Sequence, residues 1–157
     1  MSQSSISFAK GALPRTENER AAVAVIEGIL NRDAELLRKH LASDAVFQLP
    51  LPAFEGKAIR GLDNIVPVFS TMRASNYTNA QGKIFSIVSS GDRVIIEWIV
   101  SSTVKATGAA YKSWYCFSYR LEHGKVAEAL QYADTAYGRD MLGEGPTKAV
   151  EGVIGNR

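Results

Sequence analysis

The sequence predicts an α+β fold in which N-terminal helices pack on one face of a sheet of long antiparallel strands. Up to about residue 73, apolar residues recur at helical spacing, and after residue 79 segments rich in β-branched and aromatic residues alternate with short turns. The length of 157 residues suits one domain with one core. Lys and Arg number 18 and Asp and Glu 16, a net charge of +2 with scattered basic residues, so we expect no nucleic-acid partner.

The N-terminal half is expected to hold three helices. Residues 1–14, rich in Ser and Gly, predict a flexible N-terminal arm. Thr16 then opens the first helix, because Glu19 three residues later completes a capping box. Asp33 can cap a second helix, and a third is expected over residues 63–73. The domain itself is expected to span residues 15–142.

One short strand is expected over residues 45–49. The second half of the sequence then predicts a meander of longer strands. Its expected long strands cover residues 83–89, 93–105, 112–122 and 125–132. His123 and Gly124 form a two-residue hairpin loop between the last two. Strands of this length twist and coil, and the concave face of a coiled sheet can hold a pocket. Residues 143–157 predict a C-terminal tail, either flexible or crossing a neighbouring subunit.

The cysteine, the N-terminal residues and the histidines indicate which cellular compartment and which cofactors to expect. Cys116 is the only cysteine, so no intramolecular disulfide can form, which is compatible with a reducing compartment. The first ten residues lack the pattern of a signal peptide, and no apolar window of about 18 residues exists. We therefore expect a cytoplasmic protein without membrane contact. His40 and His123 lie far apart without clustered thiols or carboxylates, so no metal and no other cofactor is expected.

Five short segments carry a resemblance to a known family. They cover residues 41–47, 56–61, 91–94, 119–126 and 132–135. Their order and spacing resemble the SnoaL-like polyketide cyclases of the NTF2-like, or ketosteroid-isomerase-like, superfamily over roughly residues 16–142. The resemblance implies a cone-shaped fold, in which three N-terminal helices pack on a strongly curved, mainly antiparallel sheet that encloses a pocket. The fold hosts many reactions and also non-enzymatic proteins, so it implies less about chemistry.

Asp134 is the main catalytic candidate. The resemblance implies an Asp at this strand end that acts as acid or base inside the pocket. Independently, a carboxyl group that faces an apolar cavity loses hydration, which raises its pKa toward a useful range. Tyr132 is the second candidate, as a hydrogen-bond donor to a substrate oxygen. The alternative stays open that Asp134 caps a short helix over residues 135–142.

Strand alternation extends this prediction to the pocket wall. If Asp134 points inward, so do Glu128, Leu130 and Tyr132. The resemblance places the inward-facing residues of the other strands, and together these give the predicted substrate-binding residues Phe47, Leu49, Trp98, Val100, Tyr115, Phe117, Tyr119 and Leu130. Such an aromatic, mostly apolar cavity suits a hydrophobic ligand with a few oxygens.

The sequence departs from related catalytic patterns. The resemblance places Val25, Leu49 and Phe117 where ketosteroid isomerases carry a Tyr and two Asp residues. It places Phe47, Leu49, Val100 and Trp98 at positions of the water-holding residues of limonene epoxide hydrolases. Neither of those mechanisms is therefore expected.

Two functions remain open. The first is a small cofactor-independent cyclase, isomerase or dehydratase that acts on a hydrophobic oxygenated molecule, such as a polyketide or terpenoid, with Asp134 as general acid or base. The alternative is a non-catalytic small-molecule-binding or dimeric interaction module of the same fold. In either case we expect a homodimer through the outer sheet face, which carries Ile95, Ile99, Trp114 and Cys116.

Overall fold

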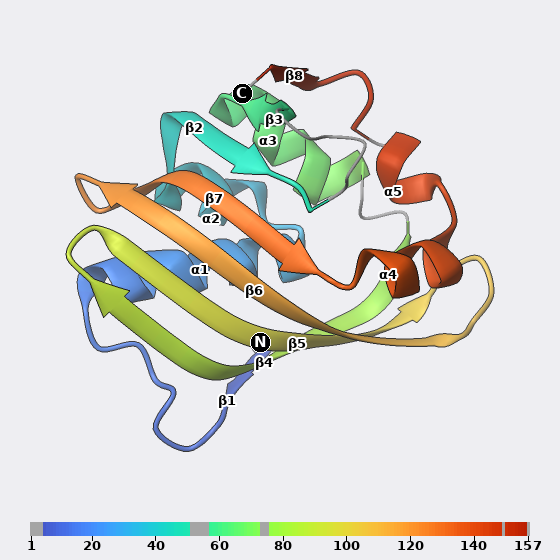
Figure 1. Cartoon of the computed structure of the whole chain (residues 1–157), viewed down its shortest axis with the longest axis horizontal. Coiled ribbons are helices and arrows are strands. Elements are labelled where there is room, and N and C mark those ends of the chain that lie inside the picture. Colours follow the sequence, from blue (N-terminus) through green and yellow to red (C-terminus); the bar gives the residue numbers. More distant parts are fainter. Residues whose placement is uncertain (1–4, 51–56, 73–75, 149, 157) are drawn as a thin grey trace.

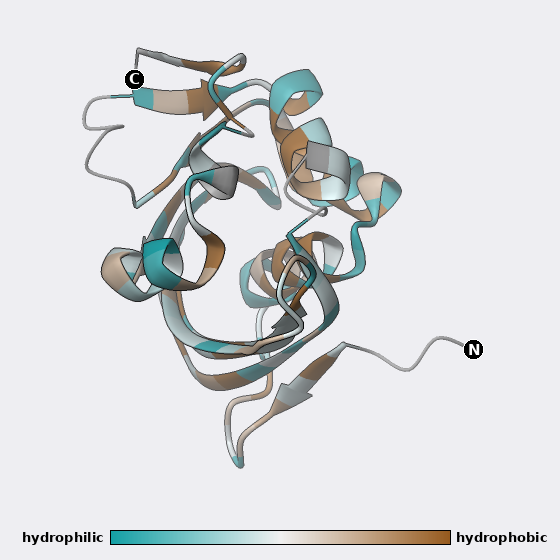
Figure 2. Ribbon diagram, turned by 90° about the vertical axis from the view of Figure 1, so that its right-hand side faces the viewer, coloured by the Kyte–Doolittle hydropathy of each residue, from teal (hydrophilic) through white to brown (hydrophobic). Residues whose placement is uncertain are grey.

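The fold is built on one eight-stranded sheet that curls around its helices (Figures 1 and 2). The computed structural model describes residues 5–50, 57–72, 76–148 and 150–156. The strand order is β1-β4-β5-β6-β7-β2-β3-β8. The strands are β1 (Ile6–Phe8), β2 (Leu41–Gln48), β3 (Lys57–Arg60), β4 (Tyr77–Ser90), β5 (Arg93–Val104), β6 (Ala110–Glu122), β7 (Lys125–Ala133) and β8 (Ile154–Asn156). Among the strand pairs of the described residues only β1–β4 and β2–β7 are parallel, so the predicted mainly antiparallel α+β fold is confirmed.

The expected helix starts are also confirmed for the first two helices. Helix α1 (Glu17–Asn31) begins with the capping box, in which Thr16 Oγ1 accepts from the Glu19 amide at 3.1 Å. Helix α2 (Ala34–His40) is capped by Asp33, whose carboxylate accepts from the Leu36 amide at 2.9 Å. Strand β2 follows α2 directly, four residues earlier than the expected start at residue 45.

The third helix is shorter than expected and changes type. Helix α3 (Leu62–Pro67) leads into a π-helical turn, η2 (Val68–Met72). Pro67 is the last residue of α3, and its ring and missing amide proton prevent regular α-helical hydrogen bonding there. The hydroxyls of Ser70 and Thr71 donate to the carbonyls four residues earlier, at 2.8 and 2.7 Å. This widened turn places Phe69 against the sheet interior, where it is buried.

The terminal segments complete the two edges of the sheet. Strand β1 pairs with β4 and β8 pairs with β3, while Ile6 and Val150 are buried. Residues 6–8, within the predicted arm, and residues 154–156, within the predicted tail, are therefore short strands at the edges of the sheet. Helices α4 (Thr135–Leu142) and α5 (Gly145–Lys148) connect β7 to β8. No helix in the described part of the chain is long and apolar enough to span a membrane.

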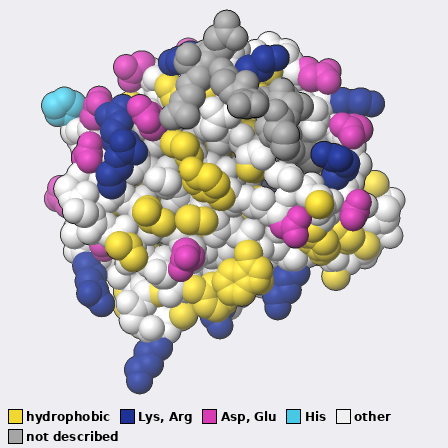
Figure 3. Space-filling model, viewed as in Figure 1, with side chains coloured by type: hydrophobic (Ala, Val, Ile, Leu, Met, Phe, Trp, Pro, Cys, Tyr) yellow, Lys and Arg dark blue, Asp and Glu magenta, His cyan; other side chains and the backbone are white. Residues whose placement is uncertain are grey.

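The outer face of β4 to β7 carries exposed hydrophobic side chains (Figure 3). On this face Trp114 is 60% and Tyr132 is 55% exposed. Trp114 lies against Phe85, with ring centroids 4.8 Å apart. The opposite, inner face of β5 and β6 is buried, as expected from alternation, with Trp98, Phe117 and their neighbours turned toward the helices.

A β-bulge in the β6–β7 hairpin decides which face the side chains of β7 occupy. The loop at His123 and Gly124 adopts positive φ at both residues, and Glu122 pairs with Lys125 as expected. Leu121 pairs with Val126, but Arg120 then pairs with Glu128, so Ala127 is an extra residue in β7. Beyond this point the register of β7 is shifted by one residue, which exchanges its inner and outer faces.

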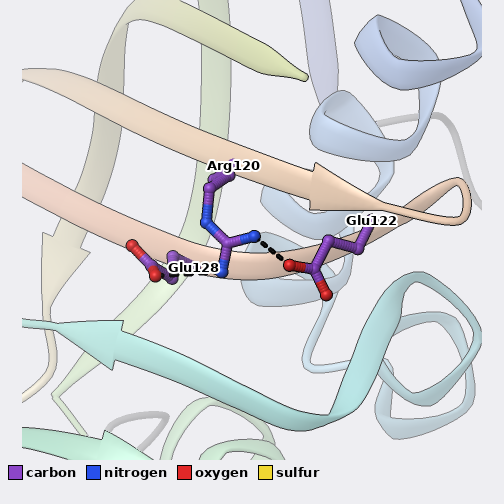
Figure 4. Close-up of polar contacts among 3 residues, drawn as sticks. All are labelled: Arg120, Glu122 and Glu128. Atoms are coloured by element: carbon purple, nitrogen blue, oxygen red, sulfur yellow. Dashed lines mark hydrogen bonds and ion pairs between the residues drawn. The ribbon is translucent and has the colours of Figure 1, made fainter.

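Arg120 forms ion pairs on both sides of the bulge (Figure 4). Its guanidinium donates to Glu128 at 2.9 Å across the strands and also to Glu122 on its own strand. Arg120 and Glu128 are directly opposed in the shifted register, and both are only partly exposed on the outer face. Opposite charges at directly opposed positions favour that pairing, so these contacts support the shifted register.

Glu19 fastens the start of α1 to strand β4. Glu19 is a buried residue, and its carboxylate accepts from the Arg15 and Thr16 amides at 2.5 and 3.2 Å and from Ser89 Oγ at 2.6 Å. Burial alone raises the pKa of Glu19, but the hydrogen bonds from Ser89, Arg15 and Thr16 together outweigh it and hold the pKa below its ordinary value.

We expect Glu19→Gln to lower the free energy of unfolding by about 1–3 kcal/mol at neutral pH, because a charged acceptor becomes neutral. Since the pKa is lowered in the folded state, the stabilisation is present above the ordinary value of 4.5 and is lost as the pH falls through the lowered pKa. Urea unfolding at neutral and acid pH measures both effects. Glu17→Gln, which changes an exposed carboxylate of the same turn, serves as the control. Equal losses in the two variants would contradict this role.

Candidate functional site

A cavity of about 90 Å³ lies between the C-terminal end of α1 and the inner face of the sheet, partly open to solvent. Its wall draws on α1, η2 and four consecutive strands. The lining residues are Ile29, Leu30 and Arg32 at the end of α1, Phe69 in η2, Tyr77 and Ala80 in β4, Trp98 and Val100 in β5, Tyr115 and Phe117 in β6, and Gln131 in β7. An engineered apolar cavity of about 150 Å³ holds benzene, so a ring bound here would extend toward the mouth.

Aromatic rings form most of one wall. The Trp98 indole stacks on Tyr115 at 5.1 Å between centroids and meets the edge of Phe117 at 5.4 Å. Gly82 in β4 allows this packing, because a Cβ there would lie 2.8 Å from Leu30 Cδ1 and 3.4 Å from the Trp98 ring. The absence of a side chain at Gly82 therefore helps to keep the space between α1 and β5 open.

Every polar side chain of the described lining can donate a hydrogen bond, and those of Tyr77, Tyr115 and Gln131 can also accept one. Trp98 is 97% buried, and its Nε1–H has no partner among the described residues. Gln131 is buried directly opposite Phe117. The Tyr115 hydroxyl lies 3.1 Å from that of Tyr111. Arg32 is exposed at the cavity's edge. No carboxylate or histidine is among the described lining residues, so this part of the wall can bind an acceptor oxygen but offers no general base of the usual kinds.

Seven of the eight predicted substrate-binding residues are on the inner side. Four of them line the cavity, namely Trp98, Val100, Tyr115 and Phe117. Phe47, Leu49 and Tyr119 are buried but are not among its lining residues. Phe47 packs behind the wall, 4.6 Å from Phe69 between ring centroids.

Tyr119 lies in the core next to Phe117, with ring centroids 5.7 Å apart. Its hydroxyl is fully buried without a partner among the described residues. Burial raises the pKa of Tyr119 well above its ordinary value, so the group stays protonated as a donor.

The predicted inward orientation of Leu130, Tyr132 and Asp134 is wrong. The bulge at Ala127 places Leu130 and Tyr132 opposite Ser118 and Cys116, whose side chains are on the outer face. Without the extra residue, Tyr132 and Leu130 would have opposed Tyr115 and Phe117 on the inner face.

Asp134 is exposed and serves as the N-cap of α4. Its Oδ1 accepts from the Tyr137 amide at 2.9 Å, as in the alternative interpretation of this residue. The apolar surroundings on which the predicted acid or base role depended are therefore not present around this carboxylate.

Asp134 and Tyr132 instead share a wide, open hollow of about 760 Å³ on the outer face. Cys116 and Glu97, directly paired across β5 and β6, also line it. Burial, with the Glu97 carboxylate beside it, raises the pKa of the Cys116 thiol, so the thiol is not an activated nucleophile. Within the described residues no group of three or more His, Cys, Asp or Glu side chains can hold a metal ion.

Seven of the eleven lining residues are absent from the sequence-based prediction, and among them Gln131 and Arg32 carry an amide and a charged side chain. Gln131 is an isolated polar residue between small and apolar neighbours, which is compatible with either face of a strand. Arg32 follows the first helix with φ of 59°, a position where glycine is the usual residue. An arginine at a helix end gives no signal of a binding site by itself, and only the curled sheet brings it to the cavity.

The comparisons with known proteins concern most of the chain. The family profile described as the SnoaL-like domain matches residues 22–129. A candidate SnoaL-like polyketide cyclase from Jannaschia sp. CCS1 is similar with a TM-score of 0.72 and 10% identity, over 84% of this chain and 95% of that one. IdmH, a candidate polyketide cyclase from Streptomyces antibioticus, is similar with a TM-score of 0.68 and 22% identity, over 82% of this chain and 99% of that one. An LEH-like epoxide hydrolase of M. tuberculosis is similar with a TM-score of 0.65 and 20% identity, over 85% of this chain and 90% of that one. No curated protein matches the chain significantly.

The capping role of Asp134 predicts a difference between two substitutions. Asp134→Ala should lower the free energy of unfolding by about 0.5–2 kcal/mol, because the Tyr137 amide loses its acceptor. Asp134→Asn should change the free energy of unfolding by only a few tenths of a kcal/mol, since Asn caps helices about as well as Asp. Chemical denaturation of the two variants measures this difference. Equal destabilisation by Asn and Ala would contradict the capping role.

Proposed function

Because the chain belongs to the SnoaL-like domain family, we propose that its inner cavity binds a small, largely apolar molecule that carries an acceptor oxygen. The observation that carries this proposal is the Trp98 Nε1–H, a buried donor without a partner in the described structure, within a cavity wall of aromatic rings. A buried donor left unpaired costs about 1–3 kcal/mol. A ligand carbonyl or hydroxyl oxygen would remove that cost, while its apolar body would pack on Tyr115 and Phe117.

The second candidate is a cofactor-independent cyclase, isomerase or dehydratase that acts on a polyketide- or terpenoid-like molecule. It is supported by the same donors, since Trp98 and Gln131 can stabilise negative charge that develops on a substrate oxygen. Asp134 as the acid or base stays a prediction, and it requires the reacting group to reach the outer hollow, where Tyr132 also lies. Because Asp134 is exposed, we favour ligand binding over catalysis as the function of the inner cavity. The expected cytoplasmic location likewise stays a prediction.

The binding proposal is tested with benzamide, a neutral ring with one carbonyl, by ligand-observed NMR. We expect Trp98→Phe to weaken benzamide binding about threefold to tenfold, because it keeps an aromatic side chain but removes the indole N–H and its hydrogen bond of about 1 kcal/mol. Trp114→Phe is the matched control, since it makes the same change on the outer face. The proposal fails if benzamide does not bind, or if both variants weaken binding equally.

The outer face supports the further proposal that two copies of the chain pair through it. Ile95 and Trp114 are exposed there, together with Val88, which pairs with Ile95 and lies on the same face. Ile99, also predicted for this face, is already buried within one chain, and Cys116 is half-buried. Exposed apolar side chains gathered on one sheet face are typical of a protein interface, and a twofold pairing would cover them on both copies.

We expect the wild-type chain to sediment as a dimer and Trp114→Glu to sediment as a monomer, because a buried unpaired carboxylate strongly opposes association. Asn31→Glu, which adds the same charge on exposed α1, should remain dimeric. A wild-type chain that stays monomeric at high concentration in analytical ultracentrifugation would contradict the pairing.

A further inference from the structure

The described lining of the inner cavity contains a single charged side chain, and it is positive. Arg32 lies at the edge of the cavity, and none of the other described lining residues is Asp, Glu, His or Lys. The interior beyond it is formed by aliphatic and aromatic groups with Gln131 as its only amide side chain. A molecule that enters the cavity therefore passes a cation and meets no fixed negative charge in this part of the wall.

Arg32 is held at this place by its own contacts. It is the C-cap of α1, with φ of 59° and its amide bonded to the carbonyls of Gly28 and Ile29. Its guanidinium donates from Nη2 to the carbonyl of Tyr77, a residue of β4 that also lines the cavity. The side chain thus connects the end of α1 to β4 at the cavity instead of extending freely into solvent.

Within the described part of the chain, the Arg32 guanidinium has one hydrogen-bond partner, so most of its donors stay available to a ligand. It has five N–H donors, of which the Tyr77 contact uses one. The neighbouring carboxylate of Asp33 caps α2 through the Leu36 amide, and no ion pair between Asp33 and Arg32 is formed. A planar guanidinium with free donors binds a carboxylate through two parallel hydrogen bonds, which a neutral carbonyl cannot match.

We propose that the ligand of this cavity is a monoanion, an apolar ring compound whose carboxylate is held by Arg32 while its ring packs on Trp98. This inference rests on the proposed binding function and adds the charge of the ligand. It makes Arg32 a specificity residue that selects acidic molecules over neutral ones of the same shape. Because the guanidinium is exposed, the selection should weaken as the salt concentration rises.

The test compares benzoate with benzamide, which share the ring and nearly the same shape but differ in charge. We expect the wild-type chain to bind benzoate at least fivefold more tightly than benzamide in low salt, measured by ligand-observed NMR titration. In Arg32→Gln the preference for benzoate should fall to twofold or less, because benzoate loses more affinity than benzamide does. Arg20→Gln, which removes one positive charge from the exposed start of α1, should retain the preference.

The possible failures are distinguishable. Equal binding of the two probes by the wild-type chain overturns the anion preference and leaves the binding function intact. A preference that persists in Arg32→Gln, or that Arg20→Gln removes equally, overturns the role of Arg32. Absence of binding by both probes overturns the proposed function and this inference with it. Thermal unfolding of each variant confirms that the compared proteins are folded.

Discussion

One extra residue in β7 determines which side chains reach the interior. Ala127 has no partner on β6, and from Glu128 onward every residue of β7 lies on the face opposite to the one that uninterrupted pairing would give. Gln131 is inside as a result, while Leu130 and Tyr132 are outside. The pairs of Arg120 with Glu128 and Glu122 lie on the outer face at the same point and favour the shifted register.

The chemistry available to the cavity follows from that shift. With β7 in the unshifted register, a tyrosine would have faced the aromatic wall, and the strand would have led toward an inward carboxylate. The shifted strand supplies an amide instead, and Asp134 becomes the cap of α4 at the surface. The described wall is therefore apolar with donor groups, which suits recognition of an oxygen-bearing ligand better than proton abstraction.

Much of the architecture was predictable from local signals. The capping box at Thr16 and the glycine turn after His123 are decided by hydrogen bonds and backbone angles within a few residues. The inward placement of Trp98 and Phe117, which followed from the family resemblance together with strand alternation, is also correct. These patterns depend little on distant parts of the chain.

The errors concern features that depend on pairing between segments. Along β7, Ala127, Ala129 and Leu130 are all compatible with burial, so alternation could not reveal the bulge. The edge strands β1 and β8 are only three residues long and gain their order from β4 and β3 rather than from their own composition. Arg32 reaches the cavity only because α1 ends above the curled sheet. Such placements follow from tertiary contacts, which a single sequence does not display.

The orientation of β7 can be measured directly by nuclear Overhauser effects in the isotope-labelled protein. The account predicts cross-peaks between the side-chain amide protons of Gln131 and the ring protons of Phe117. It also predicts that Tyr132 ring protons show contacts with Cys116 and none with Phe117. Cross-peaks that join Tyr132 or Leu130 to the Phe117 ring, with none from Gln131, would contradict the shifted register and return the tyrosine to the cavity.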